Sequence, residues 1–252
     1  MEDEFVGVVH RVIAGIAPGV PVADISHHVP PHDVRFGALT LWRTAPWLAP
    51  GVVLAVVDPG VGTKRRAVAI AVSPADVVLV GPDNGLLLPA ALRLGPITAA
   101  VELEQTQTGR GATFAGRDLF APAAARLAVG ADLHELGAAI DPQTLRGEPV
   151  PVPERRPDGS LRAEVLWIDR FGNVQLNLNP RDAGPLGPVL DVRTDAHTRP
   201  ARLVEAYADL QVDELGLVHD SYDLLSISLY AASAAALTGV RPGDPVWLSH
   251  RD

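Results

Sequence analysis

Three short runs in the first half of the chain are apolar at successive positions. They are residues 52–57 (VVLAVV), 67–72 (AVAIAV) and 77–80 (VVLV). Strands with this pattern are covered on both faces, as in a parallel sheet flanked by helices. Stretches at 5–14, 34–45, 86–94 and 118–127 predict those helices, and the first follows acidic residues that suit a helix N-terminus. The pattern predicts an N-terminal α/β domain with a mainly parallel sheet.

The second half of the chain has a different pattern of apolar residues. Its apolar runs are short and bounded by turn residues, at 163–168, 173–177, 189–192, 224–228 and 245–249, with one helix-like stretch at 231–237. This indicates a smaller, mostly antiparallel β domain. The segment 147–162 is rich in proline and charge and has no apolar periodicity, so it is the predicted linker. We therefore expect an α/β fold class with domains at 1–150 and 161–252.

Composition narrows the possible functions. The chain has 252 residues, is 47% hydrophobic and contains no cysteine, which excludes disulfides and thiol chemistry. Its net charge of −9, without a basic stripe, argues against a nucleic-acid partner. The acidic start lacks signal-peptide features, and no apolar stretch approaches the roughly 18 residues of a membrane span. A cytoplasmic protein without membrane contact is expected.

The sequence VVDPGVGTKR at 56–65 is the strongest candidate for chemistry. An apolar strand runs directly into Asp58, at the sheet edge where open α/β sheets bind ligands. Arg65 can fold back towards Asp58, and a carboxylate beside a guanidinium can orient a water or a hydroxyl. From this segment alone, a stiff turn with a surface ion pair is the stronger expectation. The spacing of a phosphate loop is absent.

Three other loops have both an ordinary and a functional interpretation. The loop GPDNG at 81–85 follows a strand, so it is either a turn into a helix or a second loop at the edge that carries Asp58. In TFAGRDLF at 113–120, Gly116 would let a ligand approach, and Asp118 occupies a helix N-cap position. In DRFGN at 169–173, Phe171 and Asn173 could hold a flat heterocycle, although an ordinary turn is more expected for the segment alone.

One cluster contains several potential metal ligands. Histidines and acids gather between Asp24 and Asp33, in DISHHVPPHD. Two prolines interrupt the segment, and no helical i, i+4 pair of ligands results. We therefore expect capping and turn roles for Asp24, Ser26 and Asp33, and no metal site.

The motifs DISHHVPPHDV, VVDPGVGTKRR, GPDNGLL, TFAGRDLFAPAAA, IDRFGN, AYAD and GVRPGDPV occur together and in this order. The ordered set resembles the S-adenosylmethionine hydrolase (hydroxide adenosyltransferase) family, which is related to the fluorinase and chlorinase. The resemblance implies a larger N-terminal α/β domain, a smaller β domain, and a homotrimer with active sites between subunits. It also implies a small-molecule substrate, S-adenosyl-L-methionine, and no cofactor. Family members begin with a strand ending in Asp-x-Gly that carries a ribose-binding Asp; its absence before Asp3 predicts a misassigned start or a truncated chain.

In this family a nucleophile attacks the ribose C5′ atom and methionine departs. An Asp-Arg-His set handles water in the hydrolases; Asp58 and Arg65 match its first two members, and Ala115 stands in place of the His. The resemblance also implies substrate contacts, with Asp3 at the methionine ammonium and Asp169 and Asn173 at the methionine moiety or adenine edge. The other implied contacts, at the nucleoside pocket, the nucleophile and the methionine carboxylate, are Phe114, Gly116, Phe171, Ser221, Tyr222 and Ala231.

Hydrolysis of S-adenosylmethionine to adenosine and L-methionine is the favoured activity. The acid at position 58 would repel a halide but can orient water, and the segment 67–80 is compact. A chloride transferase with a halide pocket at Ala115 and Gly116 is the alternative. A nucleoside-binding protein that has lost turnover, through Ala115 and the missing strand, is the third possibility.

Overall fold

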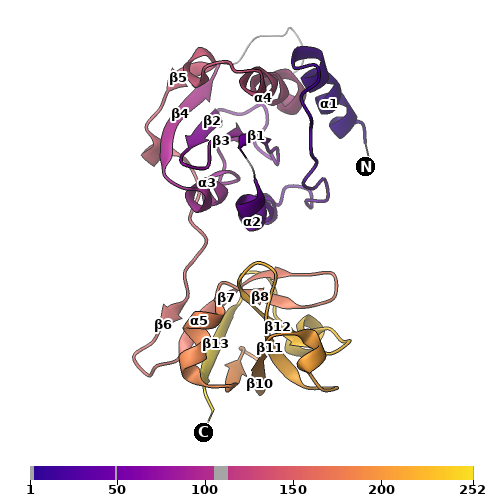
Figure 1. Ribbon diagram of the computed structural model, residues 1–252, viewed down its shortest axis with the longest axis vertical. Coiled ribbons are helices and arrows are strands. Elements are labelled where there is room, and N and C mark those ends of the chain that lie inside the picture. Colours follow the sequence, from indigo (N-terminus) through magenta and orange to yellow (C-terminus); the bar gives the residue numbers. More distant parts are fainter. Residues whose placement is uncertain (1–2, 49, 105–112, 252) are drawn as a thin grey trace. The chain divides into compact units, whose positions relative to one another are not determined.

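The chain divides at residues 149 and 150 into two units that pack separately, Met1–Pro149 and Val150–Asp252 (Figure 1). This computed structural model describes residues 3–48, 50–104 and 113–251. The segment 150–160, part of the expected linker, is grouped with the second unit, where it supplies the short strand β6 (Glu154–Arg155).

The first unit contains a five-stranded sheet in the order β1-β3-β2-β4-β5. The strands are β1 (Gly51–Leu54), β2 (Ala67–Val72), β3 (Val77–Pro82), β4 (Ile97–Leu103) and β5 (Gly137–Ala139). The α-helices are α1 (Phe5–Ile16), α2 (Val34–Thr44), α3 (Leu88–Leu94) and α4 (Ala121–Ala128). A π-helical turn over Gly116–Phe120 leads directly into α4, and short 3-10 turns lie at Ala45–Trp47, Leu133–Glu135 and Pro142–Thr144.

Side chains of β2 show why apolar and polar residues do not alternate in the runs that form these strands. Val68 and Ile70 belong to a core cluster with Ala90 of α3, whereas Ala69 belongs to another cluster with Phe120. Figure 1 shows α2 and α3 on one side of the sheet and α1 and α4 on the other. Because successive side chains of a strand point to opposite faces, coverage of both faces requires an apolar residue at every position. The predicted coverage on both faces is confirmed.

The prediction that this sheet is mainly parallel is wrong. Only β1 and β3 pair in parallel; β3 with β2, β2 with β4 and β4 with β5 are antiparallel. Continuous apolar runs indicate that both faces are covered, but they carry no information on strand direction. The four residues between β2 and β3 form a hairpin turn, far shorter than the dozen or so residues that a parallel crossover needs.

The second unit is a closed barrel. Its strands are β7 (Leu161–Ile168), β8 (Val174–Leu176), β9 (Val189–Arg193), β10 (Thr198–Val204), β11 (Leu215–His219), β12 (Leu225–Leu229) and β13 (Pro245–His250). They follow the ring order β13-β9-β10-β11-β12-β8-β7, which β13 closes by pairing with β7. Only β10 and β11 pair in parallel, so the predicted mostly antiparallel β structure is confirmed.

Apolar residues from around the ring fill the barrel. Fully buried Val165, Leu176, Leu217 and Leu248 belong to one core cluster. Two short helices, α5 (Pro180–Ala183) and α6 (Ala234–Thr238), complete the unit together with 3-10 turns at Gly184–Leu186 and Tyr207–Asp209. None of the helices in the described ranges is long and apolar enough to cross a membrane.

Candidate active site

Asp58 and Arg65 form a buried ion pair on the loop that follows β1. The strand ends at Leu54, three residues earlier than predicted, although Ala55 still donates a backbone hydrogen bond to Val80 of β3 at 3.0 Å. Arg65 donates from Nε to Oδ1 of Asp58 at 2.8 Å and from Nη2 to Oδ2. The side chains of Asp58 and Arg65 are only 5% and 8% exposed. The expected fold-back of Arg65 is confirmed, and the expectation of a surface ion pair is wrong.

The turn between the two residues holds the pair in one orientation. Val61 donates its backbone N–H to the carbonyl of Asp58 at 3.2 Å, and the Thr63 hydroxyl donates to the carbonyl of Gly60 at 2.7 Å. The Arg65 guanidinium lies over the ring of Phe120, 5.0 Å from its centroid. Both carboxylate oxygens of Asp58 are therefore fixed in position, and each keeps acceptor capacity for a further donor such as water.

A second loop lies at the same edge of the sheet. Asn84 follows β3 and donates from Nδ2 to the carbonyl of Val57 at 2.9 Å, next to Asp58. The Oδ1 atom of Asn84 accepts from the backbone N–H of Leu86 at 3.2 Å. Because β1 and β3 are parallel, their carboxyl ends meet at one edge, and the predicted second loop beside Asp58 is confirmed.

Asp83, the neighbour of Asn84, is nearly fully buried. Its Oδ2 atom accepts from Nε of Arg66 at 2.8 Å, and its Oδ1 atom accepts from the backbone N–H of Arg146 at 2.7 Å. Arg66 also donates to the Thr144 hydroxyl at 2.9 Å. This network ties the residue after Arg65 to both the β3 loop and the end of the first unit.

Ala115 begins the π-helical turn and packs against the apolar cluster that contains Phe120. The Arg65 guanidinium lies over the ring of Phe120, which belongs to the same cluster. Asp118 lies inside the π-helical turn and its carboxylate binds Arg117, with two hydrogen bonds of 2.7 Å. The predicted N-cap role of Asp118 is wrong.

Aromatic packing accounts for the glycine at position 116. Phe5 and Phe114 stack with their centroids 5.1 Å apart and 17° between ring planes. A Cβ atom on Gly116 would lie 2.6 Å from Cζ of Phe5. The close approach that Gly116 permits is therefore made by Phe5 within the same chain. Asp3, expected at a methionine ammonium, accepts from the backbone N–H of Phe5 at 3.0 Å at the start of α1.

In the barrel unit, Asp169 organises the turn between β7 and β8. Its Oδ1 atom accepts from the backbone N–H groups of Phe171 and Asn173, both at 2.9 Å, and Oδ2 accepts from Nδ2 of Asn173 at 2.8 Å. Phe171 is 64% exposed, with the Arg170 guanidinium 4.7 Å from its ring centroid. Gly172 has a φ of +85°, and a Cβ there would collide with Ser233. The turn presents an exposed aromatic ring beside a fixed amide.

The other predicted barrel residues lie at opposite ends of β12. Ser221 and Tyr222 precede this strand, on a turn where Asp220 accepts the backbone N–H of Tyr222 at 2.8 Å. Ala231 follows the strand and is exposed, with a φ of +53°. The turn at Gly172 packs near the Ala231 end, through a 2.9 Å hydrogen bond from the N–H of Ala235 to the carbonyl of Gly172.

Tyr207 extends this group of barrel residues. Burial is the main cause that raises the pKa of the Tyr207 phenol, and the nearby carboxylates of Asp169 and Asp220 raise it further. Tyr207 was not singled out as a site residue from the sequence, although it lies in the AYAD motif. Both carboxylates therefore lie close enough to the Tyr207 phenol to affect its pKa.

The histidine-rich segment gives mixed outcomes. Asp33 accepts from the backbone N–H of Phe36 at 2.8 Å and caps α2, as predicted, and Ser26 accepts from the N–H of His28 at 3.2 Å in a turn, also as predicted. The capping role predicted for Asp24 is wrong. Its Oδ1 atom instead contacts Nε2 of His10 at 2.9 Å and Nε2 of His27 at 3.0 Å. Hydrogen bonds from these histidines, that from His27 foremost, lower the pKa of Asp24.

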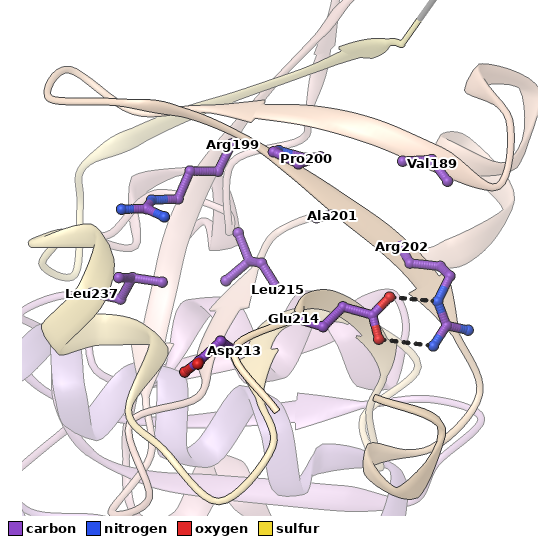
Figure 2. A pocket seen from close by; sticks show the side chains of 9 residues that line it. All are labelled: Val189, Arg199, Pro200, Ala201, Arg202, Asp213, Glu214, Leu215 and Leu237. Atoms are coloured by element: carbon purple, nitrogen blue, oxygen red, sulfur yellow. Dashed lines mark hydrogen bonds and ion pairs between the residues drawn. The ribbon is translucent and has the colours of Figure 1, made fainter. Parts of the chain in front are cut away.

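A shallow pocket of about 230 Å³ lies on the barrel, away from the predicted residues (Figure 2). Its lining includes Val189, Pro200, Ala201, Leu215 and Leu237, and Figure 2 shows Glu214 and Arg202, which also line it, paired with each other. Arg202 donates from Nε to Oε1 of Glu214 at 2.7 Å and from Nη2 to Oε2 at 3.0 Å. These bonds, with one from the backbone N–H of Gln211, lower the pKa of Glu214 to about 2. Arg202 and Glu214 are twelve positions apart in sequence, so no local pattern indicates the pair.

Two family models and several known proteins are similar in sequence to this chain. Residues 1–137 match the SAM hydroxide adenosyltransferase N-terminal domain and residues 163–247 match the C-terminal domain of that family. A relative from Salinispora tropica, named (R)-S-adenosyl-L-methionine hydrolase, is 48% identical over 97% of this chain and 92% of its own length. A fluorinase from an Actinoplanes species is more distant, with 27% identity over 73% of this chain and 70% of its own.

A solved structure of similar fold supports the same relationship. The crystal structure of an uncharacterized conserved protein from Thermotoga maritima matches with a TM-score of 0.88 and 30% identity, over 99% of this chain and 96% of that one. Both domain models together span most of the sequence. The chain belongs to the SAM hydroxide adenosyltransferase family.

Proposed function

We propose that this protein hydrolyses S-adenosyl-L-methionine to adenosine and L-methionine, with Asp58 and Arg65 handling the attacking water. The observation that carries the proposal is the buried ion pair between these residues at the carboxyl edge of β1 and β3. The name of the Salinispora tropica relative states the same substrate and the same class of reaction.

The reaction needs little beyond alignment of a nucleophile. The water oxygen forms a bond to C5′ of the ribose while the C5′–S bond breaks, and the electron pair of that bond leaves with sulfur as the neutral thioether of methionine. A sulfonium is already a good leaving group, so neither a general acid nor a cofactor is required. The free acceptor positions of Asp58 orient the water and take up its proton, and Arg65 keeps the carboxylate in place.

Residues of both units are the proposed substrate contacts. In the first unit these are Asp3, Phe114 and Gly116. In the barrel unit the exposed ring of Phe171 offers a stacking surface for adenine, and Asp169 and Asn173 offer polar groups beside it. Ser221, Tyr222 and Ala231 complete the proposed set. The family resemblance implies a homotrimer in which neighbouring subunits share each site, and we propose the same assembly for this chain.

Halide transfer is the second candidate, because a fluorinase is among the relatives. A buried carboxylate at position 58 disfavours an attacking anion, and the ring of Phe5 occupies the space beside Gly116 where a halide pocket was considered. A binding protein without turnover is the third candidate, since Ala115 removes one member of the water-handling set.

Incubation with S-adenosylmethionine, with and without chloride, followed by chromatography separates the three candidates. Hydrolysis gives equal amounts of adenosine and methionine at the same rate in both samples. A 5′-chloro nucleoside that forms only with chloride identifies a halide transferase. Unchanged substrate, together with saturable binding of adenosine, identifies a binding protein. Either of the last two results contradicts the proposal.

A further inference from the structure

Three donor atoms from two separate segments converge beside α1. Nε2 of His10, on α1, lies 2.9 Å from Oδ1 of Asp24, and Nε2 of His27 lies 3.0 Å from the same oxygen. All three atoms lie within 4.8 Å of one another. In a tetrahedral Zn²⁺ site with bonds of about 2.0–2.1 Å, neighbouring ligand atoms are roughly 3.3 Å apart. The two imidazole nitrogens therefore lie within about 0.5 Å of the distance from the carboxylate oxygen that ligands of one such ion have.

We propose that His10, Asp24 and His27 bind one divalent first-row transition-metal ion of the Zn²⁺ type. Two imidazole nitrogens and one carboxylate oxygen form a donor set that such ions favour, whereas Ca²⁺ and Mg²⁺ are held mainly by oxygen. Each imidazole would bind through Nε2 and carry its proton on Nδ1, so the Nε2–H hydrogen bonds to Asp24 are replaced by bonds to the ion. Water fills the remaining positions.

The charge of Asp24 and the exposure of all three side chains suit them to bind a metal ion. An aspartate carboxylate is ionised at neutral pH and so is available as a ligand. The side chains of His10, Asp24 and His27 are 38%, 46% and 39% exposed, which leaves a route for an ion from solvent and room for bound water. The site does not involve Asp58, Arg65 or any proposed substrate contact, so it is independent of the proposed hydrolysis.

A bound ion would link the long irregular connection between α1 and α2 to helix α1. Asp24 and His27 lie between α1 and α2, in a stretch without regular secondary structure, whereas His10 is in the second turn of α1. Two residues beyond His27, Val29 packs against α2: a Cβ on Gly37 would lie 3.7 Å from its Cγ1 atom and 3.0 Å from Cγ2 of Val57. The ion would thus restrain a segment that packs beside the residue preceding Asp58.

Metal binding can be measured directly on the untagged full chain after removal of metal with a chelator. Titration with Co²⁺, followed by visible absorption, should saturate at one ion per chain, and Zn²⁺ should displace the Co²⁺ signal. Zn²⁺ should also raise the melting temperature. His27→Gln and His10→Gln, which remove ligands from different segments, should each weaken Co²⁺ binding by at least about tenfold.

His28→Gln is the matched control, because His28 is exposed in the same segment but outside the cluster. It should bind Co²⁺ as the wild-type chain does. The proposal is overturned if the wild-type chain shows no saturable binding at one ion per chain. It is also overturned if His27→Gln and His10→Gln bind normally, or if His28→Gln loses binding as they do. Far-UV circular dichroism of the metal-free variants establishes whether each is folded. If His27→Gln is misfolded, Co²⁺ binding by His10→Gln tests the proposal alone.

Discussion

The guanidinium of Arg65 lies over the ring of Phe120, with 5.0 Å between its central carbon and the ring centroid. This contact joins the loop after β1 to the π-helical turn that leads into α4. The same guanidinium binds both carboxylate oxygens of Asp58, so the position of this proposed catalytic base depends on two different elements. Substitutions on either element therefore have distinct expected effects.

Asp58→Asn should leave the fold intact and remove most of the turnover. The amide keeps the shape of the side chain but cannot take a proton from water, and loss of a positioned base typically costs about 10²–10⁴-fold in rate. The measurement is adenosine formation in a single turnover, with circular dichroism as the control for folding. Hydrolysis at a near-wild-type rate by the folded variant would remove Asp58 from the proposed mechanism.

Arg65→Ala should destabilise the first unit. It leaves the Asp58 carboxylate buried without its charged partner, a change that typically costs about 3–5 kcal/mol in the free energy of unfolding. Denaturant unfolding measures the loss. The double variant Asp58→Asn, Arg65→Ala should recover part of it, because the unpaired charge is gone; a double variant as unstable as the sum of both single variants would contradict this account.

Ala115→His should accelerate hydrolysis. An imidazole at this position restores the third member of the family's water-handling set, and one donor in a preorganised site is worth on the order of 10²-fold in rate. Adenosine binding should be unchanged. Ala115→Leu, of comparable size but without a proton to share, is the control and should give no gain. If Ala115→His is no faster, another group completes the set, and His219 is then the next residue to test.

Gly116→Ala should destabilise the chain by about 1–3 kcal/mol, because the added Cβ lies 2.6 Å from Cζ of Phe5 and the stacked rings must shift. Phe5→Leu in the same chain makes room and should reduce the penalty. A double-mutant cycle of unfolding free energies measures this coupling. Strict additivity of the two substitutions would show that Phe5 does not require the glycine.

Glu214 should make the stability of the barrel depend on pH in the acid range. Its pKa falls from an ordinary value of 4.5 to about 2 in the folded chain. The stabilisation is therefore fully present above about pH 4.5 and is lost as the pH falls towards 2. Glu214→Gln should flatten this part of the stability–pH curve, measured by denaturant unfolding. Glu205→Gln, an exposed acid of the same unit, should leave the curve unchanged.

Local sequence patterns predicted helices and strands well where a single residue or a single apolar run determines where the element begins and ends. The run at 67–72 becomes β2 with the same bounds, and Asp33 caps α2, because burial on two faces and a side-chain cap are both local properties. The pairing of Asp58 with Arg65 was also predictable, since only six residues of turn separate them.

Contacts between residues that lie far apart in sequence could not be predicted from local patterns. The antiparallel pairing of β2 with β4 depends on tertiary packing rather than on the apolar runs themselves. His10 meets Asp24 across the connection between α1 and α2, and the sequence around His10 is an ordinary amphipathic helix. The substrate roles of the barrel residues rest on the family resemblance and remain predictions.

Closure of the barrel has a consequence for how the protein is made. The ring is completed by β13, the last of its strands in sequence, which pairs with β7, the first strand of the ring, and with β9. During synthesis the second unit therefore has no closed form until β13 has left the ribosome, whereas the hairpin of β2 and β3 can form early. Contacts of such long sequence separation form slowly, so the nascent barrel keeps apolar strand faces exposed until β13 pairs.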